Sequence, residues 1–431
     1  MRRFNLPALA ACILLFGLSA APARAEFTAI AGWDKQLFPS YIIATASIRH
    51  GDAPVAKEHL GDPTGLLGVA VKSPAPNTPV RVSLECPEYF ETSTFSGMLT
   101  NGESTYRIFP KIKFDYDRLA RCTQAAPAVV TFRVQLGDQA EEEQTVTFTI
   151  RSVNDCPIEV SLGDEVIDTS FTFAAYVNEQ HPFVDKLLRE ALDIGVVDRF
   201  TGYQSGDEKM VLLQAYALWD LLVARDMRYS DITTSAAESA SVESQHVRLL
   251  EDSVNNSQAN CVDGAVLWVS MMRKIGIDAF LVMEPNHCYA AFYADAEHEK
   301  RYAVETTLLG QEISSDDVKV PDIFGEAIEE DNRDEASFPS FVEAVQSASK
   351  KLTKNSAKYQ SAETSDYRFI DVAAARKIGV LPIAFLGKEE FVYFDHSYDE
   401  EEEEDEEDCE DEECECECED DCECEECDDD A

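Results

Sequence analysis

An apolar helix followed at once by two apolar strands, between residues 260 and 310, constrains the fold of this chain more than any other segment. In the stretch NCVDGAVLWVSMMRKIGI, apolar residues recur at helical spacing and Gly276 ends the pattern. An apolar strand, Ala279–Met283, comes next, and a Pro285-Asn286 turn leads into the strand HCYAAFY. RYAVETTLLG predicts a further strand. We expect a mixed α+β domain around this helix.

Three of these elements carry a side chain suited to nucleophilic catalysis. Cys261 opens the helix, His287 enters the following strand and Glu305 lies in the last strand. The partial positive charge of a helix N-terminus and a nearby imidazolium both favour the thiolate form of a cysteine. We therefore expect an imidazole beside the thiol and a carboxylate behind the imidazole, which is the order that a cysteine nucleophile needs.

The segments NCVDGAVLWVSMMRKIGIDAFLV, NHCYAAFY and YAVETTLLG resemble the core of the transglutaminase-like superfamily, whose fold is related to that of papain-like proteases. The resemblance covers about Ala174 to Gly310 and points to a bacterial, exported branch. It implies that Cys261 is the nucleophile and His287 the base. The third member of the family's triad is usually Asp, whereas Glu305 stands in the matching position here.

The same resemblance implies a polar donor upstream of the cysteine that helps to hold the oxyanion. Tyr229 and Gln245 are both candidates for that role. Next to the nucleophile, we expect Asn260 to cap the helix and Asp263 to favour its N-terminus.

Other polar residues of this region are expected to be structural. Cys288 should point away from His287 and pack in the core, because successive strand residues face opposite ways. A metal site of Cys261, His287 and Cys288 is disfavoured for the same reason, and we expect neither a metal nor a cofactor. His181 and His246 match neither triad position, so surface or packing roles are expected.

The first 25 residues are typical of a cleaved signal peptide. They combine Arg2 and Arg3, an apolar run from about Leu9 to Ala21 and an Ala23-Arg24-Ala25 cleavage site. A lipobox-like Leu9-Ala10-Ala11-Cys12 is an alternative that the length of the apolar run disfavours. No later run approaches the roughly 20 apolar residues that cross a bilayer, so we expect a periplasmic or secreted protein without a transmembrane segment.

Residues 26–155 alternate with period two, which predicts an antiparallel, immunoglobulin-like β-sandwich. We expect the transglutaminase-like domain to span 156–398. Its clearest further helices are Pro182–Leu192, Lys209–Asp226 and Phe338–Lys351, with a loop at Ser235–Glu243 and an acidic surface loop at Glu326–Glu335. Cys86, Cys122 and Cys156 allow one disulfide, whose partners the sequence does not give.

The segment 399–431 should be a disordered acidic tail. It holds 25 Asp or Glu residues and no Lys or Arg, which is about half of the formal net charge of −47. This charge argues against nucleic-acid binding, which needs basic patches. A cationic partner or a soft metal ion suits the tail, because Cys-x-Cys spacing lets neighbouring thiolates share one ion. The tail cysteines are Cys409, Cys414, Cys416, Cys418, Cys422, Cys424 and Cys427.

Together these patterns predict an exported cysteine protease or amidase that acts on peptide or amide bonds through a thioacyl intermediate. Two alternatives stay open. The domain is a catalytically inactive peptide-binding module of the cell envelope, or an amine takes the place of water and the protein is a crosslinker. The expected substrate is a peptide or protein in each case.

Overall fold

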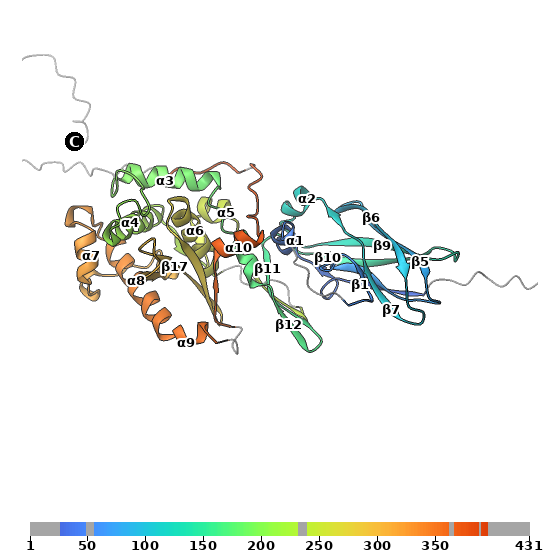
Figure 1. Ribbon diagram of the computed structural model, residues 1–431. Helices are drawn as coiled ribbons and strands as arrows, with labels where there is room; N and C mark the ends of the chain where they lie inside the picture. The colour runs from blue at the N-terminus through green and yellow to red at the C-terminus, as the bar shows by residue number, and fades with distance from the viewer. Residues whose placement is uncertain (1–25, 49–55, 232–238, 362–365, 388, 395–431) are drawn as a thin grey trace, which may run out of the picture. The chain divides into compact units, whose positions relative to one another are not determined.

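The computed structural model describes residues 26–48, 56–231, 239–361, 366–387 and 389–394. The described residues up to Tyr393 belong to one compact unit that combines helices with several β-sheets (Figure 1). This confirms the expected mixed α+β class. The expected signal peptide and the expected acidic tail lie outside the described residues, and the expected domain boundary near residue 155 stays a prediction.

Two sheets formed by the N-terminal part share one hydrophobic core. Along β9, alternate residues from Val130 to Leu136 are buried, as period-two patterning predicts. The period-two pattern of the sequence is also apolar on one face around Val82, Phe132 and Phe148, and these residues lie in β5, β9 and β10. One sheet has the order β1 (Phe27–Ala31), β4 (Leu67–Lys72), β7 (Thr105–Phe109), β3 (His59–Gly61), and the other β2 (Gln36–Leu37), β10 (Glu142–Ile150), β9 (Ala126–Leu136), β5 (Thr78–Cys86), β6 (Phe90–Leu99), β8 (Lys113–Phe114).

The expectation of wholly antiparallel sheets is wrong at two edges. β3 pairs with β7 in parallel, and so does β2 with β10. A parallel pair needs a long connection rather than a tight hairpin. Both edge strands are short and reach their partners from far away in the sequence, a pairing that local alternation does not encode.

The remaining elements surround the segment that the sequence analysis singled out. A four-stranded sheet has the order β18-β17-β16-β19, and a three-stranded sheet has the order β12-β11-β14. The helices expected at residues 182–192, 209–226 and 338–351 are all confirmed. The bounds are β11 (Asp155–Leu162), β12 (Glu165–Asp168), α3 (Pro182–Ile194), α4 (Glu208–Ala224), β13 (Arg228–Tyr229), β14 (Val242–His246), α5 (Leu250–Asn255), β15 (Gln258–Ala259), α6 (Cys261–Lys274), β16 (Ala279–Glu284), β17 (His287–Tyr293), β18 (Arg301–Val304), α7 (Asp322–Ala327), α8 (Ser337–Lys354), β19 (Arg368–Ile370) and α10 (Val372–Ile378).

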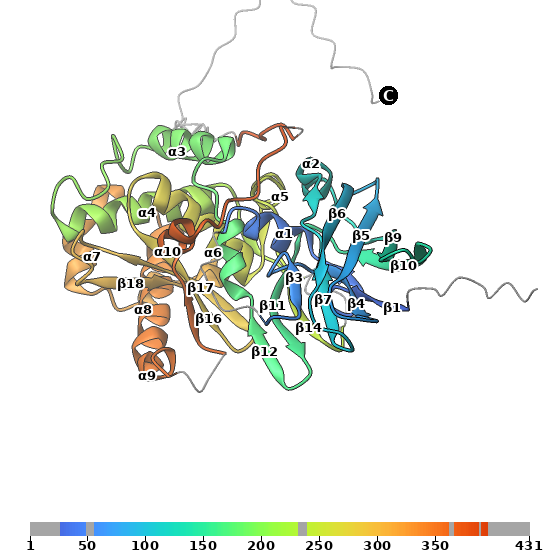
Figure 2. The same cartoon turned by 45° about the vertical axis from the view of Figure 1, so that its right-hand side comes forward.

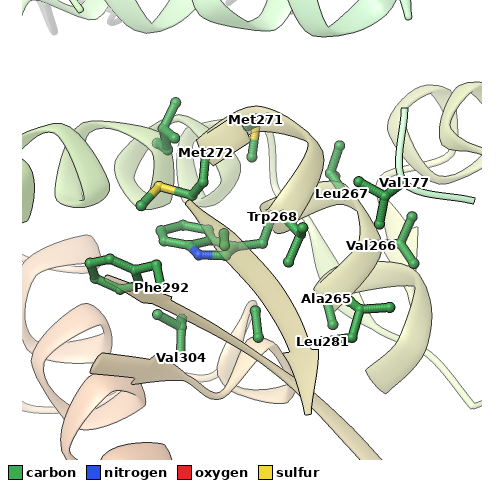
Figure 3. Close-up of a cluster of buried hydrophobic side chains, with 14 of the residues drawn as sticks. Val177, Ala265, Val266, Leu267, Trp268, Met271, Met272, Leu281, Phe292 and Val304 are labelled. Atoms are coloured by element: carbon green, nitrogen blue, oxygen red, sulfur yellow. The ribbon is translucent and has the colours of Figure 1, made fainter. Parts of the chain in front are cut away.

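Helix α6 lies against the four-stranded sheet. Figure 3 shows Trp268 and Met272 of this helix above Leu281, Phe292 and Val304 of the strands, and all five side chains are buried. Apolar positions recur along the whole helix, so it is covered on nearly every side. Removing such large side chains from water favours folding by about 2 kcal/mol each. This packing fixes the helix, and with it the position of its first residue, relative to β17.

Two expectations need correction near the C-terminal end of this region. Glu305 was expected inside a strand, but β18 ends at Val304 and Glu305 precedes a short 3-10 helix, Thr306–Leu308. Its backbone N–H donates to Ala344 of α8 at 3.1 Å instead of continuing the sheet. Helix α8 lies along β18 (Figure 2). The acidic run 326–335 is not only a loop, since it includes the end of α7 and a 3-10 turn, Glu330–Asn332.

The described cysteines are all free thiols, so the structure pairs none of Cys86, Cys122 and Cys156. Cys156 is fully buried, and burial raises its pKa. Within the described ranges, no helix is long and apolar enough to cross a membrane. The expected loop at 235–243 lies partly outside the described residues, and its last residues open β14.

Candidate active site

Cys261 is the first residue of α6, and its helix start is held by a reciprocal cap. The side chain of Asn260 accepts hydrogen bonds from the backbone N–H groups of Val262 and Asp263, both at 2.9 Å. In return, Asp263 accepts from the backbone N–H of Asn260 at 3.0 Å. Arg248 also donates to Asp263, at 2.7 Å. The expected roles of Asn260 and Asp263 are therefore confirmed, and they hold the half-buried thiol at the helix N-terminus.

His287 is the first residue of β17 and follows a tight turn in which Asn286 has a φ of +57°. Its Nε2 lies 2.8 Å from Oε2 of Glu305. The Cys261 side chain lines the same cleft as the imidazole and is near enough to raise its pKa. Since Glu305 takes Nε2, Nδ1 is the ring nitrogen left for the thiol. The structure thus brings the three predicted residues together in the expected order.

The charge state of His287 follows from these contacts. Burial lowers the pKa of the imidazole, but the interactions with Cys261 and Glu305 and the charge of Glu305 outweigh burial and raise the pKa to about 9. The imidazole is therefore protonated at neutral pH. A positive charge beside the thiol is the environment in which reactive cysteines are found.

Glu305 is nearly inaccessible to solvent and accepts three side-chain hydrogen bonds. Besides His287, the donors are Thr307 at 2.9 Å and Lys351 at 2.7 Å. Burial raises the pKa of this carboxyl, but the bonds and charges of His287 and Lys351 outweigh burial and lower the pKa to about 2. The carboxylate is therefore ionised over the whole physiological range.

Lys351 is the residue that sequence reasoning missed. It lies on α8, far from the triad in sequence, and shares one oxygen of Glu305 with His287. Its Nζ also lies 5.2 Å from the centre of the Tyr289 ring. The sequence analysis predicted the helix that carries Lys351. Periodicity shows which residues of a helix face the core, but it does not show which distant side chain they meet.

A cleft of about 410 Å³ opens beside Cys261 and His287. Both oxyanion candidates line it. Tyr229 has 41% of its surface exposed, and Gln245 donates to the carbonyl of His246 at 3.0 Å. The structure places both side chains at the cleft and does not favour one over the other. Their roles as donors to a substrate stay predictions.

The residues expected to be structural lie in structural environments. Cys288 borders the cleft, but it is buried in the core and burial raises its pKa well above its ordinary value. His181 is also buried: its Nδ1 accepts from the backbone N–H of Phe183 and its Nε2 lies 3.0 Å from Glu251. His246 lies 3.4 Å from Asp155. Over the described ranges, no three His, Cys, Asp or Glu side chains form a group that could hold a metal ion.

Neither models of protein families nor curated proteins match this chain.

Proposed function

We propose that this chain is an exported cysteine hydrolase of the transglutaminase-like superfamily that cleaves peptide or amide bonds. In this proposal the region around α6 has the transglutaminase-like, papain-related fold, and the N-terminal sheets form an immunoglobulin-like sandwich. The contact that supports the proposal most is the 2.8 Å bond between His287 and Glu305, with the Cys261 side chain in the same cleft and near enough to raise the pKa of the imidazole.

The first half of the reaction acylates the enzyme. The Cys261 thiolate attacks the amide carbonyl carbon, and the electron pair of the C=O double bond moves to oxygen. The backbone N–H of Cys261 belongs to the first helical turn, where no intrahelical acceptor exists, so it is free to bind this oxyanion. When the C–N bond breaks, protonated His287 gives its proton to the leaving amine. A thioester with Cys261 results.

The second half releases the product. His287, now neutral, takes a proton from water while the water oxygen attacks the thioester. The C–S bond breaks, the carboxylic acid leaves and the thiolate is restored next to the imidazolium. Glu305 orients His287 throughout and stabilises its charge. If an amine replaces water in this half, the same residues crosslink proteins.

Replacing the nucleophile tests this proposal directly. We expect Cys261→Ala to abolish turnover of peptide amides, since loss of a nucleophile lowers rates by several orders of magnitude. The free energy of unfolding should fall by only about 1 to 2 kcal/mol, because few buried atoms are lost. Thermal melts beside rate assays measure both effects. Cys122→Ala, which removes a partly buried thiol outside the cleft, is the matched control. Turnover that survives Cys261→Ala would rule out the mechanism.

Covalent labelling separates an enzyme from an inactive binding module. An electrophilic amide probe should label Cys261, and His287→Ala should suppress that labelling because the imidazolium no longer stabilises the thiolate. Labelling that is equal in the two proteins would favour the binding module. Adding an amine to a reaction that turns over then tests for a crosslinker, since amide product forms only if the amine competes with water.

A further inference from the structure

The cleft beside Cys261 carries an excess of negative charge. The described residues that line it include five carboxylates but only two cationic groups, one guanidinium and the protonated imidazole of His287. The single guanidinium, Arg368, is already paired with Glu159 at 2.8 Å and with Asp168 at 2.7 Å. The lining carboxylates are Glu159, Asp231, Glu243, Glu284 and Asp366.

Three of these carboxylates have no partner among the described residues. Asp231, Glu243 and Asp366 are all exposed and make no ion pair or side-chain hydrogen bond there. Glu243 on β14 even lies directly opposite Glu159 on β11. Like charges opposite each other on paired strands destabilise a sheet. Arg368 compensates the charge of Glu159, so the charge of Glu243 is left uncompensated among the described residues.

Two further groups in the same cleft also lack a partner. Tyr229 is 41% exposed and lines the cleft. Burial, followed by the nearby charges of Cys261 and Asp231, raises the pKa of Tyr229, so its ring stays neutral. Asn260 is 96% buried beside the nucleophile and lines the cleft, and its Nδ2 has no hydrogen-bond partner among the described residues. An exposed aromatic face next to a carboxylate suits a cation, and an unpaired amide donor suits a carbonyl oxygen.

We infer that the cleft selects a polypeptide segment with a Lys or Arg side chain close to the scissile amide. The cationic group lies against the Tyr229 ring and is attracted by Asp231, Glu243 and Asp366, while the amide carbonyl reaches Cys261. This rests on the proposed function, because it names the substrate class of the same site. Acidic segments are repelled by the same carboxylates.

Three small electrophiles of different charge test this in the full-length chain. Iodoacetamide is neutral, 2-bromoethylamine is a cation and iodoacetate is an anion. The rate at which each modifies Cys261 is followed by mass analysis of the peptide that contains it, and the two charged rates are divided by the neutral rate. Relative to free cysteine, we expect the cation to be favoured and the anion disfavoured, at low ionic strength most of all.

The variant Asp231→Asn/Glu243→Gln/Asp366→Asn should reduce each of these two preferences by roughly tenfold, because it removes three unit charges that line the cleft. The control Asp138→Asn/Glu297→Gln/Asp316→Asn makes the same charge change at exposed positions that do not line the cleft, and it should keep both preferences. All six substitutions are at exposed residues, so folding should survive.

The outcomes distinguish the inference from the function on which it rests. The inference is wrong, and the proposed function stands, if Cys261 reacts with iodoacetamide but shows no preference between the charged probes. The same holds if the control variant loses the charge preference as much as the variant of the cleft does. If Cys261 is inert to iodoacetamide, both fail. Matched peptide amides with Lys, norleucine or Glu next to the scissile bond complete the test. The inference requires kcat/KM to fall in that order.

Discussion

One oxygen atom of Glu305 accepts two cationic donors, His287 at 2.8 Å and Lys351 at 2.7 Å. The two donors affect the site differently. The carboxylate raises the pKa of His287 and so keeps the imidazole protonated. The charge of Lys351, in contrast, lowers the pKa of both Glu305 and His287. The acid strength of the imidazolium is therefore set by a balance between a carboxylate and an ammonium group.

The charge of Glu305 should matter more than its length. We expect Glu305→Gln to lower kcat/KM by roughly 10²- to 10⁴-fold, the range for a group on which acid–base catalysis depends. Glu305→Asp keeps the anion and should cost less. Steady-state kinetics of both variants across the pH range measures the difference. If both variants match the parent, Glu305 only shapes the end of β18 and the third member of the triad lies elsewhere.

The pH dependence of kcat/KM should have a basic limb near pH 9. Protonated His287 must supply a proton to the leaving amine, and its pKa is about 9. The stability of the fold should change with pH in the same direction. Because the pKa of His287 is raised, the protonated imidazole stabilises the fold fully below the ordinary pKa of 6.5, and this contribution is lost as the pH rises through about 9. Rate profiles and melts over this range check both. If kcat/KM fell as the pH rose from 6 to 7, the assignment of the basic limb to His287 would be wrong.

Lys351→Met should move that basic limb to higher pH, because removing the ammonium group removes the charge that lowers the pKa of His287. Lys351→Arg should leave the limb near the parent's. Lys350→Met, which removes an exposed charge at the neighbouring position of α8, is the control. A Lys351→Met profile that has the limb of the parent would leave this lysine without a role in tuning the imidazole.

Among the elements, local patterning predicted those that carry Cys261 and His287, and it failed where distant segments meet. The apolar run of β17 and the helical spacing of α6 are local signals, so both elements and both residue positions were predicted. The end of β18 before Glu305 is fixed by a hydrogen bond to Ala344, and Lys351 comes from the same distant helix. No local periodicity of the sequence encodes such contacts between distant segments.

The carboxylates that line the cleft were missed for the same reason. Glu243 and Gln245 reach the cleft on β14, which pairs with β11 from far away in the sequence. The sequence analysis read the start of β14 as the end of a loop. Tyr229 and Gln245 were proposed from the family resemblance, and both line the cleft.

At the start of α6, the capping box should contribute to the stability of the fold. We expect Asn260→Ala to lower the free energy of unfolding by about 1 kcal/mol, because two backbone N–H groups lose their acceptor. Asn260→Asp keeps an acceptor oxygen and should lose less. Chemical denaturation measures the stabilities. Equal stability of Asn260→Ala and the parent would show that the cap does not hold the helix end.

In the whole molecule, the negative charge of the cleft and that of the C-terminal segment have the same sign. The segment 399–431 carries 25 acidic residues and no Lys or Arg. A polyanion concentrates cationic partners in its neighbourhood, and salt screens this effect within about 10 Å at 0.1 M ionic strength. If basic polypeptides are the substrates, the tail should raise their local concentration without taking part in the chemistry.

Deleting residues 399–431 should therefore leave the melting temperature and kcat unchanged, because a segment without aliphatic side chains other than one alanine adds nothing to a packed core. KM for a Lys-containing peptide should rise at low ionic strength and become equal to that of the full chain at high salt. A norleucine peptide is the control and should show no difference. Zinc or copper(I) titration under reducing conditions tests the other role, since micromolar binding that disappears with the deletion would assign the seven tail cysteines to a soft metal ion. Equal KM values at all salt concentrations, together with no metal binding, would leave the tail without either role.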